Sequence, residues 1–235
     1  RGHGDSQWMV GGAYSQIDYV YDIAQLLLQK QMSPVTIIGH SLGGSISLLY
    51  TALHPKNVKK LVAIEGMGPP PSMIAERFNQ PTEKRLHNWF SDLRKSSGRI
   101  VKRYPTLEDA FQRMQTENPH LSEEQARHLT IHGSNQNEDG TFSWKFDNYV
   151  RNFSPIGVPF DQTAELYANI TCPTLLIRGL ESWASDPVAD GRTKAFKCPV
   201  EVVAFANAGH WVHHDQLDSF VERVRDFLTD DHANG

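Results

Sequence analysis

Short apolar runs rich in β-branched residues alternate along this chain with longer segments whose apolar residues recur every three or four positions. The first two runs, 35–38 and 59–64, are too short for helices, so we predict buried strands there, the first of them covered on both faces. Strands are expected at residues 35–38, 59–64, 173–179 and 200–205. Helices are expected at residues 13–30, 41–54, 187–196 and 216–228. This alternation predicts an α/β fold with a mostly parallel, doubly wound sheet.

The middle of the chain carries a different pattern. Pro69, Pro70 and Pro71 cannot continue a regular element and form a rigid exit from the preceding strand. From 72 to about 166, helical spacing dominates without a buried strand, apart from a short extended segment at 139–146. Helices are expected at 82–95, 106–117 and from 122 onward, with capping signals at Thr106 and Ser122. We therefore predict core parts at 1–67 and 167–235 and an inserted helical cap at 68–166; the alternative is an independent second domain.

Composition and charge narrow the classes of partner. The 235 residues carry a formal net charge of −4 with both signs mixed, which does not favour a nucleic-acid or membrane-surface partner. No apolar stretch approaches the roughly 18 residues of a membrane span. We expect a cytoplasmic protein that binds a small molecule and needs no cofactor. A signal peptide ahead of Arg1 and the oligomeric state are left open.

Two cysteines, Cys172 and Cys198, do not make a disulfide framework. Each precedes a proline just before an expected strand, so the two thiols would lie close together if those strands are neighbours. We expect reduced, structural cysteines.

The segment Gly39-His40-Ser41-Leu42-Gly43 joins a predicted strand to a predicted helix. A sharp turn there crowds the backbone of Ser41, and glycines two positions before and after it would leave room. Such a turn presents the serine oxygen above the sheet, at the positive end of the following helix. The flanking strand and helix make this pattern typical of a nucleophile elbow.

These residues resemble the α/β-hydrolase fold superfamily in its cap-bearing branch. The resemblance runs through the opening Arg1-Gly2-His3-Gly4-Asp5-Ser6, the elbow, the strand 174–179 and Gly209-His210. It implies that Ser41 attacks a carbonyl, that His210 is the general base and that the backbone N–H of Leu42 stabilises an oxyanion. In that family the opening motif is internal, so the resemblance also implies that strands and a second oxyanion donor lie upstream of Arg1, and that the strand before Ser41 becomes a sheet edge.

The acid of the triad departs from the common family pattern. The resemblance places an aspartate three residues beyond Gly179, where this chain has Ser182. Glu65 closes the second strand, and because parallel strands present their carboxyl ends to one crevice, we predict that it orients His210. Glu181 and Asp186 remain alternatives, as does the absence of any acid; Glu65 would otherwise pair with a cation such as Arg178.

Other polar and aromatic residues gather near His210 in the sequence. His213, His214 and Asp215 follow it, but no second set of ligands accompanies them, so we predict no metal site and expect Asp215 to cap the last helix. Trp183 and Trp211 are predicted substrate-binding walls. The predicted cap would add aromatic or apolar residues, which could equally be core: Met73, Trp89 and Phe90.

A serine at the elbow excludes relatives such as haloalkane dehalogenases and epoxide hydrolases, whose nucleophile is an aspartate. The sequence predicts a serine hydrolase that cleaves a small or medium carboxylic ester, lactone or thioester through an acyl-enzyme, with Ser41, His210 and Glu65 as the triad. One alternative is hydrolysis of a carbon–carbon bond in a β-diketone-like ring-cleavage product. Another is a non-catalytic ligand-binding protein on the same scaffold.

Overall fold

The computed structural model describes residues 1–10, 14–97, 99, 101–152 and 160–230. The chain forms two compact units. One combines Arg1–Ser15 with Glu83–Pro155, and the other combines Gln16–Thr82 with Ile156–Gly235. The predicted boundaries of the cap, 68 and 166, differ from the boundaries between these two units. The role of residues 68–166 as an inserted cap stays a prediction.

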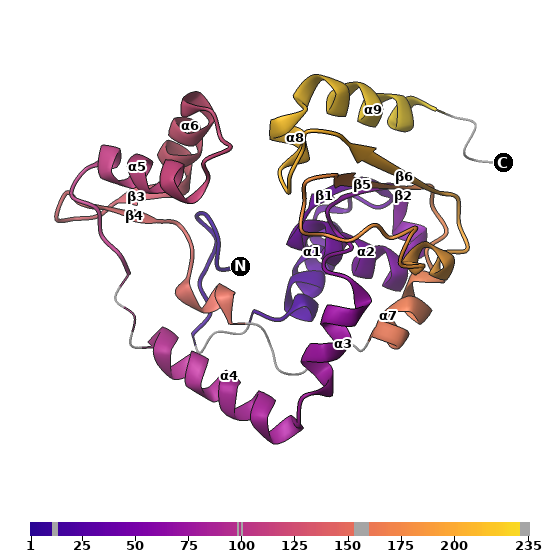
Figure 1. Ribbon diagram of the computed structural model, residues 1–235, viewed down its shortest axis with the longest axis horizontal. Helices are drawn as coiled ribbons and strands as arrows, with labels where there is room; N and C mark the ends of the chain where they lie inside the picture. Colours follow the sequence, from indigo (N-terminus) through magenta and orange to yellow (C-terminus); the bar gives the residue numbers. More distant parts are fainter. Residues whose placement is uncertain (11–13, 98, 100, 153–159, 231–235) are drawn as a thin grey trace. The chain divides into compact units, whose positions relative to one another are not determined.

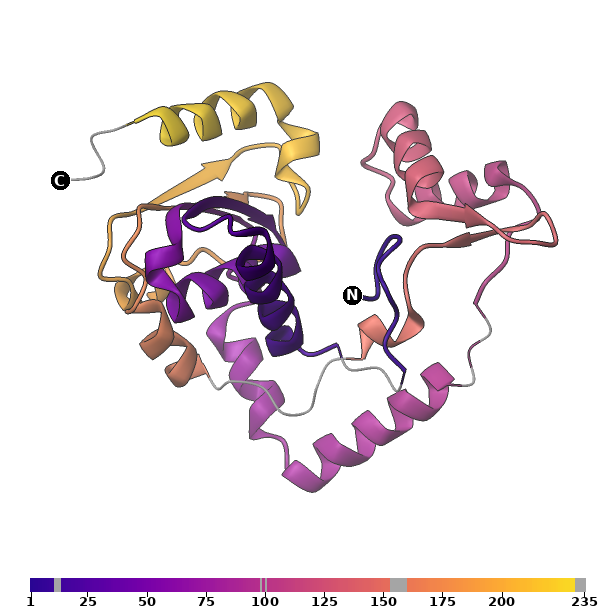
Figure 2. The same ribbon diagram turned by 180° about the vertical axis from the view of Figure 1, so that it is seen from behind.

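The second unit is built on a four-stranded parallel sheet. The strands are β1 (Val35–His40), β2 (Val58–Ile64), β5 (Thr174–Gly179) and β6 (Val200–Phe205), in the spatial order β1-β2-β5-β6. Helices α1 (Gln16–Lys30) and α2 (Leu42–Leu53) cover one face, and α8 (Val212–Asp215) and α9 (Leu217–Thr229) cover the other (Figure 1; Figure 2 shows the reverse side). The predicted doubly wound α/β architecture is confirmed.

Each face of the sheet has its own apolar core. Leu61 and Leu176 point to the α1 and α2 side, whereas Val62, Leu175 and Ile177 pack with Val224 and Phe227 on the α9 side. Short elements complete this unit: η1 (Pro55–Asn57), α3 (Pro71–Asn79), α7 (Phe160–Tyr167) and η3 (Arg192–Ala195). Among the described residues, no helix is long and apolar enough to span a membrane.

The prediction that the first strand is covered on both faces is wrong. β1 lies at the edge of the sheet and pairs with β2 alone among the described strands. Ile38 shares a face with its ladder partner Val62, yet it is 50% exposed, because the apolar residues of α9 pack over β2 and β5. The edge position itself agrees with the sequence-based expectation.

The predicted helix at 187–196 is also wrong, since only the single turn η3 forms there. Asp186 Oδ1 accepts the backbone N–H of Val188, and Asp190 Oδ1 accepts that of Arg192. Such side-chain bonds satisfy the backbone locally and compete with a helix. Gly191, with φ +83°, then reverses the chain, and the buried Arg192 side chain bonds the main chain at Met67.

The two cysteines lie on neighbouring strand entrances, as expected, and both are free. Thr174 pairs with Val200 in the ladder, and the Thr174 hydroxyl lies 3.9 Å from the Sγ of Cys198. Burial, with a smaller contribution from Cys198, raises the pKa of Cys172 to about 11. Burial also raises the pKa of Cys198, so both thiols are protonated at neutral pH.

A buried lysine anchors the end of α9. The ammonium of Lys60 donates to the carbonyl oxygens of Phe227, Leu228 and Asp230 at 3.0, 2.9 and 2.8 Å. Carbonyl groups at the end of a helix receive no hydrogen bond from the helix itself, so Lys60 supplies the missing donor. Its positive charge also interacts favourably with the negative end of the helix dipole.

We expect the Lys60→Met variant to unfold more easily by about 2–4 kcal/mol, because three carbonyls lose charge-assisted hydrogen bonds. Urea unfolding followed by circular dichroism measures this, with Lys59→Met at the adjacent exposed position as the control. Equal midpoints for the two variants would show that the lysine contacts contribute nothing.

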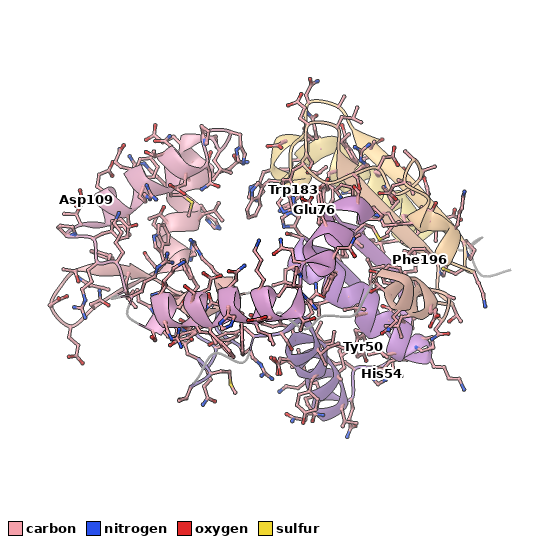
Figure 3. All side chains as sticks on the ribbon, turned by 60° about the horizontal axis from the view of Figure 1, so that its bottom comes forward. Tyr50, His54, Glu76, Asp109, Trp183 and Phe196 are labelled. Carbon is pink, nitrogen blue, oxygen red and sulfur yellow. The ribbon has the colours of Figure 1, made fainter. Side chains whose placement is uncertain are left out.

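The first unit contains α4 (Thr82–Ser97), which begins in the other unit, α5 (Leu107–Glu117), α6 (Glu123–Gly133), the hairpin β3 (Ser134–Gln136) and β4 (Phe142–Trp144), and η2 (Asn148–Arg151). Both predicted caps are confirmed as reciprocal capping boxes, Thr106 with Asp109 and Ser122 with Gln125; Asp109 is labelled at the start of α5 in Figure 3. The N-terminal segment pairs with the chain after β4, through Gly4 N–H to Lys145 O at 2.7 Å.

Candidate active site

The turn between β1 and α2 holds Ser41 in a strained backbone conformation. Its φ of +54° and ψ of −118° lie outside the regions that L-residues usually adopt. Gly39 is required sterically, since a Cβ there would lie 2.5 Å from the carbonyl oxygen of Gly43. The expectation for Gly43 is wrong, because a Cβ at that position meets no described atom within 4 Å apart from its neighbours in the chain and its own helix backbone. The close approach falls instead on Gly44, whose Cβ would lie 2.8 Å from the Cα of Gly66.

The carboxyl ends of neighbouring strands bring Ser41, Glu65 and His210 together. His40 and Ile64 are ladder partners, so the residues that follow them, Ser41 and Glu65, leave the sheet side by side. Glu65 has a φ of +54°, like Ser41. His210 arrives from the loop after β6. The three residues thus come from separate strand ends within one unit.

The distances among these side chains define a hydrogen-bonded chain. The Nε2 of His210 lies 2.8 Å from the Oγ of Ser41, and its Nδ1 lies 3.3 Å from the Oε2 of Glu65. A carboxylate only accepts hydrogen bonds, so Nδ1 carries the proton and Nε2 accepts the hydroxyl proton of Ser41. This tautomer is the one that a general base requires.

Glu65 is a fully buried carboxylate held by several donors. The backbone N–H of Gly179 donates to Oε1 at 2.7 Å, and the hydroxyl of Ser182 donates to Oε2 at 2.5 Å. Burial alone raises the pKa of Glu65, but the hydrogen bonds from His210, Ser182 and Gly179 outweigh it and lower that pKa. The side chain therefore stays ionised at neutral pH.

Glu181 and Asp186, the two alternative acids, lie in surroundings that differ from those of Glu65. Glu181 is exposed, and Asp186 lies 3.4 Å from the Nη1 of Arg178 while it also caps its own loop. Arg178, considered as a partner for Glu65, thus pairs with Asp186. Among the described residues, the carboxylate hydrogen-bonded to His210 is that of Glu65.

Leu42 and the two tryptophans lie at the same end of the sheet. Leu42 opens α2, so its N–H belongs to the first helical turn, where N–H groups lack helical partners. The Trp183 ring lies 5.1 Å from that of His210 and is 59% exposed, projecting outward from the loop after β5 (Figure 3). Trp211 stacks on His214 at 5.4 Å, and its ring lies 6.2 Å from that of His210.

Two contacts of this site were not predicted from the sequence. The Nε2–H of His40 donates to the carbonyl oxygen of His210 at 2.7 Å. Burial is the largest cause of the lowered pKa of His40, and the ring is therefore neutral at neutral pH. Asp215 does not cap α9 as expected; it accepts the N–H of Gly209 at 2.8 Å and so closes the loop that carries His210. The histidine inside the elbow motif was the available signal for the first contact.

The histidines around His210 form a packed group rather than a metal site. The His213 ring lies 4.8 Å from that of His40 and 4.5 Å from that of His214. Across the described part of the chain, no three His, Cys, Asp or Glu side chains are placed to hold a metal ion. Burial, followed by repulsion from His40 and His214, lowers the pKa of His213 from 6.5 to about 4.

This shift predicts a loss of stability in mild acid. Between pH 6.5 and 4 the unfolded chain protonates His213 while the folded chain does not, so the free energy of unfolding falls as the pH falls. We expect the His213→Phe variant to show a shallower pH dependence in that window. Thermal unfolding at several pH values measures it, with His87→Phe on the exposed face of α4 as the control. If His213→Phe kept the pH dependence of the wild-type protein, the loss of stability in mild acid could not be attributed to the low pKa of His213.

The chain matches a family model and several named proteins over most of its length. The family model of the alpha/beta hydrolase fold matches residues 1–217. The chain is 26% identical over 239 residues to the sn-1-specific diacylglycerol lipase ABHD11 of Mus musculus, covering 97% of this chain and 69% of that protein. It is 25% identical over 235 residues to the esterase Rv0045c of Mycobacterium tuberculosis, covering 97% and 72%.

A solved structure extends the likeness to the fold. The thioesterase domain from the curacin biosynthetic pathway superposes with a TM-score of 0.77 at 22% identity, covering 95% of this chain and 78% of that one. This chain therefore belongs to the α/β-hydrolase fold family. Its named relatives include a lipase and an esterase.

Proposed function

We propose that this protein is a serine hydrolase that cleaves carboxylic esters or thioesters through an acyl-enzyme. The observation that carries the proposal is the chain of contacts from Ser41 Oγ through both ring nitrogens of His210 to the buried carboxylate of Glu65. The strained turn at Ser41 and the ionised state of Glu65 support it.

In the first half-reaction, His210 Nε2 removes the proton from Ser41 as its Oγ bonds to the substrate carbonyl carbon. Glu65 stabilises the imidazolium that forms and keeps Nδ1 as the donor. The imidazolium then gives its proton to the leaving alcohol or thiol, which departs and leaves the acyl group on Ser41. In the second half-reaction water, deprotonated by Nε2, attacks the acyl carbon. The bond from that carbon to Ser41 Oγ then breaks, the imidazolium returns its proton to Oγ, and the carboxylic acid and free Ser41 are released.

The backbone N–H of Leu42 is the proposed donor to the oxyanion of each tetrahedral intermediate. Its place at the start of α2 gives it an N–H without a helical partner and the positive end of the helix dipole. A donor of this kind typically lowers the barrier by about 2.7–4 kcal/mol. Trp183 is the proposed wall of the substrate site, since its exposed ring lies beside His210; Trp211 is proposed as a second wall.

The substrate class is supported by the names of the relatives, which include a lipase, an esterase and a thioesterase domain. We expect p-nitrophenyl esters and acyl thioesters to be turned over, and β-diketone-like diketo acids to be turned over much more slowly. Initial rates on the two substrate panels, each with Ser41→Ala as the blank, measure this. Faster turnover of the diketo acids would assign the carbon–carbon hydrolase reaction. No turnover of either panel by folded protein would favour a ligand-binding role.

A further inference from the structure

Ser182 stands three residues beyond Gly179 in the loop after β5, and its hydroxyl meets the acid of the site. Its Oγ lies 2.5 Å from the Oε2 of Glu65, the same oxygen that accepts from His210 Nδ1. The Ser182 Oγ also accepts the backbone N–H of Ala184 at 3.2 Å. The hydroxyl is thus fixed from both sides.

The direction of the Ser182 hydroxyl follows from its partners. A serine hydroxyl has one proton to donate, and the N–H of Ala184 requires it to accept there. The carboxylate of Glu65 can only accept, so the proton lies on the path to Oε2. A hydrogen bond to an ionised oxygen is shorter and stronger than one between neutral groups.

We propose that Ser182 is a positioning residue for His210, acting through the carboxylate of Glu65. This inference rests on the proposed function, in which Glu65 orients the imidazole. Gly179 holds Oε1 and Ser182 holds Oε2, and the two donors come from the same strand end, so together they fix the plane of the carboxylate. Without Ser182, Oε2 keeps His210 as its remaining described donor.

The first test uses Ser182→Ala and Ser182→Thr, compared by kcat, KM and pH profile on p-nitrophenyl acetate and by the rate of fluorophosphonate labelling of Ser41. We expect Ser182→Ala to lower kcat and the labelling rate roughly ten- to hundredfold with KM unchanged, which is the size of one charge-assisted hydrogen bond. Ser182→Thr keeps the hydroxyl and restores both rates. If Ser182→Ala does not fold, Ser182→Cys, a weaker donor of similar shape, replaces it with the same expected direction.

The pH profile separates positioning from mere packing. Removing the hydroxyl takes away one of the hydrogen bonds that hold the pKa of Glu65 down, so that pKa rises and the carboxylate is protonated at a higher pH. We expect the acid limb of kcat to move to higher pH in Ser182→Ala and to return in Ser182→Thr. Unchanged rates and an unchanged limb in Ser182→Ala would overturn the proposal.

The second test, Glu65→Ser, separates failure of this proposal from failure of the proposed function. We expect Glu65→Ser to lose activity, because the imidazole of His210 loses the carboxylate that accepts from its Nδ1. An active Glu65→Ser variant would contradict the proposed role of Glu65 itself. An inactive Glu65→Ser together with an unaffected Ser182→Ala would overturn the role of Ser182 and leave that of Glu65 intact.

Discussion

Replacing Ser41 by alanine is expected to abolish turnover, with kcat/KM falling by roughly 10⁴–10⁶-fold. In the proposed mechanism the Oγ of Ser41, 2.8 Å from the Nε2 of His210, forms the acyl-enzyme, and alanine has no atom that replaces it. Initial rates on an ester that the wild-type protein cleaves measure the loss. Alanine keeps the Cβ at a positive φ, so the turn retains its packing and its strain.

The matched control for this variant is Ser45→Ala, one turn further along α2, where the hydroxyl accepts from the side chain of Gln16. It should keep most of the activity. Equal activity of Ser41→Ala and wild type would contradict the assignment of Ser41 as nucleophile.

Replacing Glu65 by glutamine is expected to lower kcat by about 10³–10⁴-fold. The amide is nearly isosteric, but it removes the negative charge and presents an NH₂ group that favours the wrong tautomer of His210. KM should change little, because Glu65 is fully buried and touches His210 rather than solvent. Steady-state kinetics with an intact-fold check by circular dichroism measure this.

Two variants in the loop after β5 serve as controls for the acid. Glu181→Gln changes an exposed side chain, and Asp186→Asn changes one paired with Arg178, so both should keep activity within severalfold of wild type. A large loss in either, with Glu65→Gln active, would move the acid to that residue.

Much of the fold and of the site follows from local sequence. Each of β1, β2, β5 and β6 contains a short apolar run too brief for a helix, and the elbow is a glycine-bracketed serine between a strand and a helix. Glu65 could be anticipated because parallel strands end at one edge, which places the residue after β2 beside the residue after β1.

Most of the errors and omissions depend on contacts between residues far apart in sequence. Local hydrogen bonds from Asp186 and Asp190 oppose the predicted helix at 187–196, and Arg192 in addition bonds the main chain at Met67, 125 positions away. The exposure of Ile38 depends on which strands the residues of α9 cover, and the close packing of Gly44 depends on Gly66. The contacts of His40 and Ser182 likewise join separate strand ends, which no local pattern encodes.

Covalent labelling with a fluorophosphonate, read by intact-mass spectrometry and peptide mapping, tests directly whether the elbow serine is an activated nucleophile. We predict one adduct per chain, located on Ser41, present in Ser45→Ala and absent in Ser41→Ala. An unlabelled but folded wild-type protein, or an adduct on another residue, would contradict the assignment of Ser41 as that nucleophile.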